Sequence, residues 1–145
     1  MSKHITIEEL EELKASIQNL ASEALKFNRD KLEENFDVTT NNIKFYNLRL
    51  KLASMLNKLE SDQAKVKKVL FKKLKEDVDF NLSKSSDMNT FIEADDEFQS
   101  YSKMISLTKN IVKYIEDVIS GLNTKHFEMK LFLEYKKFMA GECMK

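Results

Sequence analysis

The side chains best suited to binding a ligand are the lysines of one segment, residues 44–75. This segment holds ten basic residues and two acidic ones, Glu60 and Asp62, so its local charge is +8. Five lysines recur at intervals of seven residues: Lys44, Lys51, Lys58, Lys65 and Lys72. On an α-helix, residues seven apart lie almost above one another, so these lysines would form a line about 40 Å long. Such a line suits a linear polyanion better than a small ligand.

Charge is sorted into blocks along the chain, although the total charge is zero. Net charge is −4 for residues 1–43, +8 for 44–75, −7 for 76–100 and +3 for 101–145. Lysine-rich helix faces are usually solvated surface, so the lysines alone do not indicate a site. The segregation leaves two interpretations open. The basic segment binds an external polyanion, or it pairs with acidic blocks of this chain or of a partner protein.

The candidate binding residues are densest near the end of the basic segment. They are Lys58, Lys65, Lys67, Lys68, Phe71, Lys72, Lys73 and Lys75. Lysine ammonium groups contact phosphates, and an aromatic ring can stack on a nucleic-acid base. Phe71 is therefore a candidate stacking residue, although an aromatic beside Leu70 is also typical of a helix core.

No residues in the sequence are arranged for catalysis or for metal binding. His4 and His126 have no second histidine or cysteine at ligand spacing, and Cys143 has no base nearby. Two isolated glycines, Gly121 and Gly141, cannot build a phosphate-binding loop. We therefore expect a protein that is not an enzyme and that holds neither a metal ion nor a cofactor.

The composition predicts an all-α fold. Proline is absent and there are only two glycines, so little in the chain breaks helices or builds tight β-turns. Charged residues make up 33% and apolar residues 42%, and the apolar ones are periodic, which favours amphipathic helices over disorder. No apolar stretch is long enough for a membrane span or a signal peptide. We expect a soluble, cytoplasmic protein without a membrane partner.

We expect one helical domain over residues 1–145, a small bundle of long amphipathic helices with coiled-coil-like seams. Residues 1–42 hold an N-terminal helix and a hinge, residues 43–82 the basic helix, and residues 88–145 the C-terminal helices. Thr6 followed by Glu9 predicts a capping box at the head of the first helix.

Two breaks are predicted in the C-terminal half. The polar run 83–90 predicts a loop, after which an acidic block opens a long helix. Gly121 with Asn123 predicts an end or a kink in that helix, and Thr124 a cap for a short last helix. The predicted seam of the long helix is Phe98, Tyr101, Ile105, Thr108, Val112, Ile115, Ile119 and Leu122.

The predicted last helix, residues 125–140, is apolar around much of its circumference. Its apolar residues include Phe127, Met129, Leu131, Phe132, Leu133, Tyr135 and Phe138. Such a helix needs cover on more than one side. We expect a second copy of the chain to provide this cover, so that these residues form the oligomerisation surface. The alternative is a deeply buried central helix in a monomeric bundle.

Short motifs in the second part of the chain resemble a known family. The run Phe127-Glu-Met-Lys130, followed after seven residues by Phe138-Met-Ala-Gly141, resembles the closing segment of the UvsY family, the recombination mediator proteins of T-even-like bacteriophages. Ala94-Asp95 before the long helix and the step Lys67-Lys68-Val69 are similar to the same family. The order of elements agrees with that family from Ile43 onward.

The resemblance implies a small all-helical protein that assembles into a ring through its C-terminal region, in that family a heptamer. It also implies binding of single-stranded DNA and loading of a RecA-like recombinase onto strands covered by single-strand-binding protein, in an infected bacterial host cell. The alternative is a non-enzymatic helical scaffold or protein-interaction module with no nucleic-acid role.

The resemblance also bears on the candidate DNA-binding residues. In the family's DNA-contacting segment, a lysine and an arginine two residues apart follow the Lys-Lys-Val step. Here Lys72 matches the lysine, whereas Leu74 stands at the arginine position with Lys73 and Lys75 on either side. The bidentate geometry of arginine is therefore missing, and lysines are left to replace it.

Overall fold

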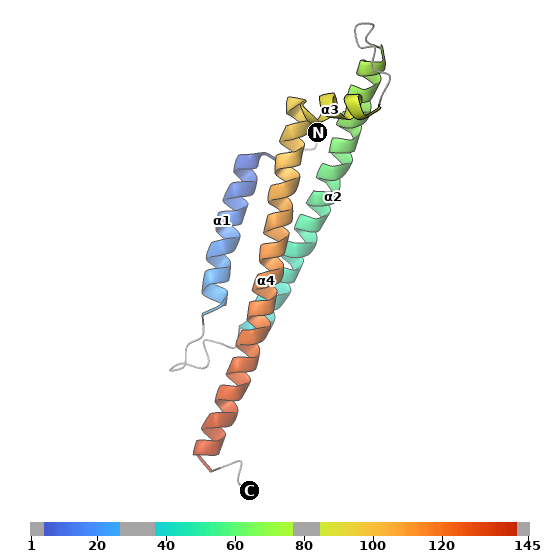
Figure 1. Cartoon of the computed structure of the whole chain (residues 1–145). Coiled ribbons are helices and arrows are strands. Elements are labelled where there is room, and N and C mark those ends of the chain that lie inside the picture. Colours follow the sequence, from blue (N-terminus) through green and yellow to red (C-terminus); the bar gives the residue numbers. More distant parts are fainter. Residues whose placement is uncertain (1–4, 27–36, 77–84, 142–145) are drawn as a thin grey trace. The chain divides into compact units, whose positions relative to one another are not determined.

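The computed structural model describes residues 5–26, 37–76 and 85–141, and nearly all of these are helical. The helices are α1 (Ile7–Ala24), α2 (Val38–Glu76), α3 (Ser85–Glu93) and α4 (Asp96–Met139) (Figure 1). No strand occurs within the described ranges, and the all-α class is confirmed. His4, Cys143, residues 77–82 of the predicted basic helix and the first two residues of the predicted loop lie outside them.

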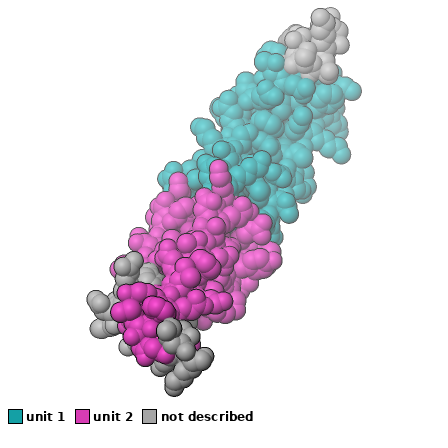
Figure 2. Space-filling view, turned by 60° about the horizontal axis from the view of Figure 1, so that its bottom comes forward, with its two compact units in different colours: residues 1–11, 52–111 teal, residues 12–51, 112–145 magenta. Residues whose placement is uncertain are grey.

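The chain divides into two compact units, which Figure 2 distinguishes by colour. Unit 1 comprises residues 1–11 and 52–111, and unit 2 comprises residues 12–51 and 112–145. Helices α1, α2 and α4 each contribute residues to both units. The single-domain organisation stays a prediction.

Unit 1 joins the start of α1, the second part of α2, all of α3 and the first part of α4. Its buried residues are Leu10, Leu52, Leu59, Met88, Ile92, Met104, Ile105, Thr108 and Ile111. Gln63 ties α2 to α4, because its Nε2 donates to the Ser102 Oγ at 2.7 Å and to the Phe98 carbonyl at 3.3 Å. The long basic helix therefore has a fixed side toward α4.

Two predicted helix starts are confirmed in this unit. The Glu9 amide donates to the Thr6 Oγ1 at 3.2 Å, as a capping box requires. The Phe98 amide donates to the Asp95 Oδ2 at 3.1 Å, and Asp96 and Glu97 fill the first turn of α4. Acids at this end of a helix are favoured by its dipole.

The predicted loop over residues 83–90 is wrong for its described part, because α3 begins at Ser85. Met88 and Ile92 stand four residues apart and are 6% and 1% exposed. On a helix that spacing puts both on one side, so burying the pair stabilises a helix in a run of otherwise weak helix formers.

Unit 2 is organised around a lysine. Lys125 is only 4% exposed, and its Nζ donates to the Ala24 carbonyl at 2.9 Å and to the Asp37 Oδ1 at 3.5 Å. Ala24 ends α1, so its carbonyl lacks a partner within the helix, and a cation suits the negative end of the helix dipole. Asp37 directly precedes α2. One side chain of α4 thus joins the end of α1 to the start of α2.

The predicted helix end near Gly121 is wrong, because α4 continues from Asp96 to Met139. The Thr124 hydroxyl does not cap a new helix but donates to the Ser120 carbonyl at 3.2 Å within the same one. A Cβ at Gly121 would lie 2.9 Å from Cδ2 of Leu25. The glycine therefore allows close approach of the residues after α1 rather than ending a helix.

The predicted seam of α4 is right at four of its eight positions, because Ile105, Thr108, Ile115 and Leu122 are buried. The other four predicted positions, Phe98, Tyr101, Val112 and Ile119, are half-buried. The remaining buried residues of α4 are Met104, Ile111, Val118, Lys125 and Met129. Thr108, a predicted member, buries its hydroxyl by donating to the Met104 carbonyl at 2.7 Å. Lys125 was not predicted because it is charged, and its burial is possible because it is paired as described above.

Replacing Lys125 by methionine keeps most of the buried volume but leaves the Ala24 carbonyl without its partner. We expect Lys125→Met to lower the free energy of unfolding by about 1–3 kcal/mol, the range for a buried hydrogen bond to a charged group. Lys113→Met, an exposed lysine of the same helix and unit, is the matched control. Urea denaturation followed by circular dichroism measures both, and equal losses would contradict the role of Lys125.

Gly121→Ala tests whether the close approach of Leu25 requires a glycine at this position. The added methyl meets only the end of the Leu25 side chain, which is 38% exposed and able to move, while alanine favours the helix by about 1 kcal/mol. We expect unchanged or higher stability for Gly121→Ala, and a loss of about 1–3 kcal/mol for Gly121→Leu because of overpacking. Urea denaturation compares the two, and a destabilised alanine variant would show that the approach of Leu25 is rigid.

Candidate nucleic-acid interface

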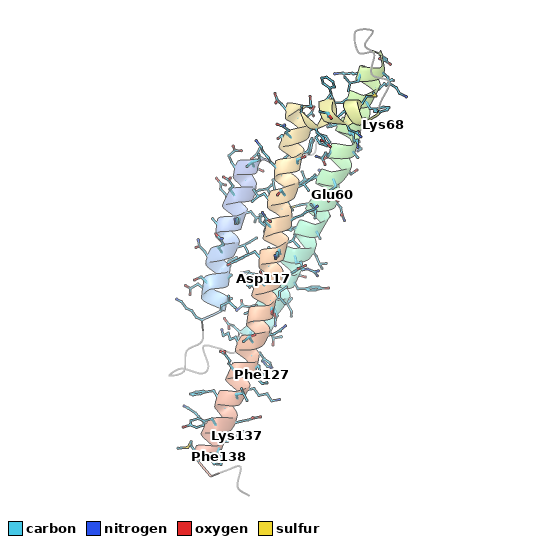
Figure 3. The ribbon with its side chains drawn as sticks, viewed as in Figure 1. Glu60, Lys68, Asp117, Phe127, Lys137 and Phe138 are labelled. Carbon is cyan, nitrogen blue, oxygen red and sulfur yellow. The ribbon has the colours of Figure 1, made fainter. Side chains whose placement is uncertain are left out.

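Five lysines of α2 in unit 1 lie on one side of the helix. Lys65, Lys68, Lys72 and Lys75 follow at steps of three, four and three, and Lys58 precedes Lys65 by two turns. We call these five residues the lysine face. All five are exposed, and Figure 3 shows Lys68 projecting from α2. From Lys58 to Lys75 the face extends about 26 Å.

The opposite side of this part of α2 packs into unit 1. Leu52 and Leu59 are buried, and Val66, Leu70 and Leu74 are half-buried. The predicted combination of one apolar stripe and one cationic side is therefore present. Leu74, at the position where the family resemblance has an arginine, lies on the apolar side, so this position contributes no cation.

Both acids of the basic segment turn toward α4. The Glu60 Oε1 lies 3.7 Å from the Lys109 Nζ of α4. Asp62 lies near Tyr101 of α4. Burial raises the pKa of the Tyr101 hydroxyl, and the negative charges of Asp62 and Glu97 raise it further. Asp62 stands four residues after Lys58 and three before Lys65, whereas from Lys65 to Lys75 the face contains no acid.

In the described part of the chain, the acidic block at the start of α4 makes no ion pair with the lysine face. Asp95 caps α4, and Asp96 and Glu97 stand in its first turn. Within residues 5–26, 37–76 and 85–141, no ion pair joins the lysine face to a carboxylate. The described residues therefore give no support to the interpretation in which the basic segment pairs with an acidic block of the same chain.

The other candidates of the basic segment differ in their surroundings. Lys67 and Lys73 are exposed but flank the lysine face. Phe71 is half-buried, and the Lys75 Nζ lies 5.0 Å from its ring centroid. This is a cation–π contact, which covers one side of the ring and positions the last ammonium of the face.

The predicted oligomerisation residues lie on the C-terminal part of α4, where Figure 3 labels Phe127 and Phe138. Phe127, Leu131, Tyr135 and Phe138 are 59%, 49%, 58% and 59% exposed. Steps of four, four and three place them on one side, which we call the C-terminal stripe. Phe132 and Leu133 are half-buried, whereas Met129 is 8% exposed and belongs to the core of unit 2. A deeply buried central helix does not describe this segment.

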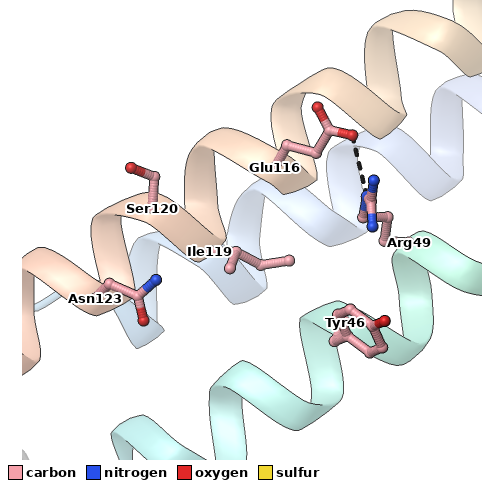
Figure 4. A pocket seen from close by; sticks show the side chains of 6 residues that line it. All are labelled: Tyr46, Arg49, Glu116, Ile119, Ser120 and Asn123. Carbon is pink, nitrogen blue, oxygen red and sulfur yellow. Dashed lines mark hydrogen bonds and ion pairs between the residues drawn. The ribbon is translucent and has the colours of Figure 1, made fainter.

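Unit 2 also contains a surface groove that the sequence did not predict (Figure 4). Two adjoining hollows of ≈ 310 and ≈ 300 Å³ lie between α2 and α4. The lining residues are Asn42, Ile43, Tyr46, Arg49, Glu116, Ile119, Ser120 and Asn123. The Arg49 Nε donates to the Glu116 Oε1 at 3.0 Å, and the Asn42 Nδ2 donates to the Asn123 Oδ1 at 3.3 Å. The signal available in the sequence was a second apolar row on α2, formed by Ile43, Tyr46 and Leu50.

Among the described residues, no group of three or more His, Cys, Asp or Glu side chains is placed to hold a metal ion. None of the described helices is long and apolar enough to cross a membrane.

Comparison with known proteins identifies one family. The family model described as "Recombination, repair and ssDNA binding protein UvsY" matches residues 9–142. The match includes most of α1, which the short motifs did not cover. No curated protein and no solved structure matches the chain.

The lysine face predicts a cost in folding stability. Like charges three or four residues apart on a helix repel by about 0.2–0.5 kcal/mol per pair. We expect Lys68→Gln combined with Lys72→Gln to leave the free energy of unfolding unchanged or to raise it by up to about 1 kcal/mol. Thermal unfolding measures this effect. Lys109→Gln, which removes the exposed pair with Glu60, is the control, and we expect it to lose at most a few tenths of a kcal/mol. Clear destabilisation of the double variant would assign these lysines to the fold.

Proposed function

Because the chain belongs to the UvsY family of recombination, repair and single-stranded-DNA-binding proteins, we propose that it is a recombination mediator that holds single-stranded DNA along the lysine face of α2. The observation that supports this most is the one-sided charge. The five ammonium groups are exposed on one side of α2, while Glu60 and Asp62 turn toward α4.

The chemistry of this face favours binding without sequence preference. Each lysine is a point charge on a flexible stem, and it contacts phosphate oxygens rather than base edges. The arginine position of the family is Leu74, so no bidentate contact to a phosphate is available there. Binding depends on released counterions and weakens steeply with salt.

A mediator must also pass the strand to another protein. We propose that the chain helps to load a RecA-like recombinase onto strands covered by single-strand-binding protein, in the cytoplasm of an infected bacterial cell. Contacts to phosphates alone are individually weak, and this suits a strand that is held and then released.

We further propose that copies of the chain assemble through the C-terminal part of α4 into a ring, a heptamer as in the resembled family. Exposed apolar side chains of the C-terminal stripe support this assembly, since exposed patches of large apolar residues mark interaction surfaces. Several lysine faces in one assembly act on one strand together, so the effective affinity exceeds that of a single protomer.

Substitution of Lys65, Lys68 and Lys72 by alanine tests the DNA-binding site. If each protomer neutralises about four phosphates, the slope of log K against log salt is roughly −3 for single-stranded DNA. We expect the triple variant to flatten this slope and to weaken binding to all sequences alike. Fluorescence anisotropy with labelled oligonucleotides at several salt concentrations gives both values.

The matched control removes the same charge from α4, at Lys103, Lys109 and Lys113, all of which are exposed. Equal losses in both triple variants would show that only net charge matters. No loss in either would favour the helical scaffold without a nucleic-acid role.

A further inference from the structure

The groove of unit 2 lies on the side of α4 that α1 leaves uncovered. On one flank of α4, Gly121 faces Leu25 and Lys125 contacts Ala24, so the end of α1 covers this side. On the other flank, Ile119 lines both hollows shared with α2. All lining residues of the groove come from α2 and α4, and no described part of α1 is among them.

The lining of the groove is apolar in the middle and polar at its ends. Figure 4 shows the Tyr46 ring of α2 across from Ile119 of α4, with Arg49 and Glu116 toward one end and Asn123 toward the other. Of the residues that line the two hollows, Arg49 and Glu116 alone are charged, and they form an ion pair at 3.0 Å. The groove therefore has no net charge, which favours a neutral ligand over an ionic one.

The polar ends of the groove offer hydrogen-bond donors. Arg49 uses its Nε for Glu116, and a guanidinium has four further N–H groups. The Asn42 Nδ2 donates to the Asn123 Oδ1, so the Asn123 amide is held in place while its own N–H groups stay available to a ligand. Each hollow, of ≈ 310 and ≈ 300 Å³, is at the lower end of small-ligand pockets. A nucleobase, which is flat with apolar faces and hydrogen-bonding edges, has the chemistry that this lining matches.

Selection of single strands requires a group that recognises unpaired bases. Phosphate contacts do not supply it, because double-stranded DNA carries a denser row of phosphates than a single strand. An aromatic side chain that stacks on a base does supply it, since the bases of a duplex are already stacked on one another and paired. The lysine face alone therefore does not explain why a family described as single-stranded-DNA-binding prefers single strands.

Tyr46 is the aromatic residue best placed to stack on a base. Phe71 is half-buried, and Lys75 covers one side of its ring. In the described part of the chain, the exposed aromatic side chains are Tyr46, Phe91, Phe127, Tyr135 and Phe138. The last three belong to the C-terminal stripe, and Phe91 of α3 lines neither hollow. Tyr46 is 50% exposed and lines both hollows.

We propose that Tyr46 stacks on an unpaired base of single-stranded DNA and that the groove of unit 2 holds this base. The inference rests on the proposed function, and it adds a subsite for a base to the phosphate contacts of the lysine face. Ile43, which is 58% exposed, and Ile119 extend the apolar surface beside the ring. Stacking tolerates every sequence because every base has a π face, so this subsite selects single strands without selecting a sequence.

Replacement of Tyr46 in the full-length chain tests the stacking. We expect Tyr46→Ala to bind a labelled strand of thymidines about 5- to 100-fold more weakly in fluorescence anisotropy, the range for loss of one stacked base. Tyr46→Phe keeps the ring and most of the affinity. The slope of log K against log salt stays that of the wild type, because no phosphate loses its cation.

Leu50→Ala is the matched control. Leu50 is 51% exposed in the same apolar row of α2 but lines neither hollow, so its loss removes apolar surface without removing the proposed stacking contact. We expect this variant to bind the strand as the wild type does. An equal loss in Leu50→Ala and Tyr46→Ala, or a fall of the oligomer mass of Tyr46→Ala in light scattering, would assign the row to a protein contact and overturn the inference.

Strands without bases separate stacking from every other effect of the substitution. On a strand of abasic sugars of the same length, we expect the wild type to bind more weakly than on thymidines and Tyr46→Ala to show no further loss. On a duplex of the same length, the two proteins should bind equally, so the preference for single strands falls in the variant. A loss of the same size on thymidines and on abasic sugars would contradict stacking.

A photochemical measurement uses the wild-type chain and so does not depend on the folding of any variant. A strand that carries iodouracil in place of thymine crosslinks under ultraviolet light to an aromatic ring that stacks on it. We expect mass spectrometry to place a crosslink at Tyr46, and a crosslink map without Tyr46 would overturn the inference. The proposed function has its own measurement, the salt slope of the lysine-face variant. Wild-type affinity in Tyr46→Ala, together with a flattened slope in the lysine-face variant, would remove the base subsite alone.

Discussion

The buried ammonium of Lys125 is the interaction on which the arrangement of unit 2 most depends. Two helix ends meet there: the last carbonyl of α1 and the acid before α2 both point at one cation from the middle of α4. Burying a charge is costly unless it is paired, so the lysine stabilises only the arrangement in which Ala24 and Asp37 are both close. The Lys125 contacts therefore also restrict how the end of α1 and the start of α2 can be placed against α4. They also explain how a charged residue occupies a core position in the seam of α4.

Close to Lys125, α4 continues through Gly121 without ending, and this determines where its C-terminal residues lie. Had the helix ended at Gly121, the C-terminal residues could fold back over the groove between α2 and α4 of their own unit. Since the helix continues to Met139, its apolar stripe stays exposed. One helix thus supplies core residues, such as Leu122, and exposed apolar residues, such as Leu131.

Much of the fold could be predicted from residue spacing, and the failures have physical causes. The starts of the first and the last long helix and the basic helix were evident because caps, acidic first turns and heptads are local patterns. The helix end at Gly121 was predicted wrongly because a glycine needed for close approach has the same letter as a glycine that ends a helix. The seam of α4 was predicted only in part, and Lys125 was missed because it is charged and only its partners in the folded chain make its burial possible.

In the candidate site, too, local patterns could be predicted from the sequence, whereas features that depend on tertiary contacts could not. The lysines of α2 are visible in the sequence, yet the pairing of Glu60 with Lys109 of α4 and the effect of Asp62 on Tyr101 depend on tertiary contacts. The groove was missed because Ile43, Tyr46 and Leu50 resemble ordinary helix residues beside the stronger apolar stripe. Its existence depends on which side of α4 the end of α1 covers.

The neutrality of the whole chain gives the lysine face a limited range. A strand far from the protein meets opposing charges that cancel, because the total is zero. Only within roughly a Debye length, about 8–10 Å in physiological salt, does the nearest group of charges dominate. Attraction to a polyanion is therefore short-ranged and depends on orientation. A uniformly basic protein attracts a polyanion from any direction, whereas the charge distribution of this chain favours a polyanion only close to the outer side of α2.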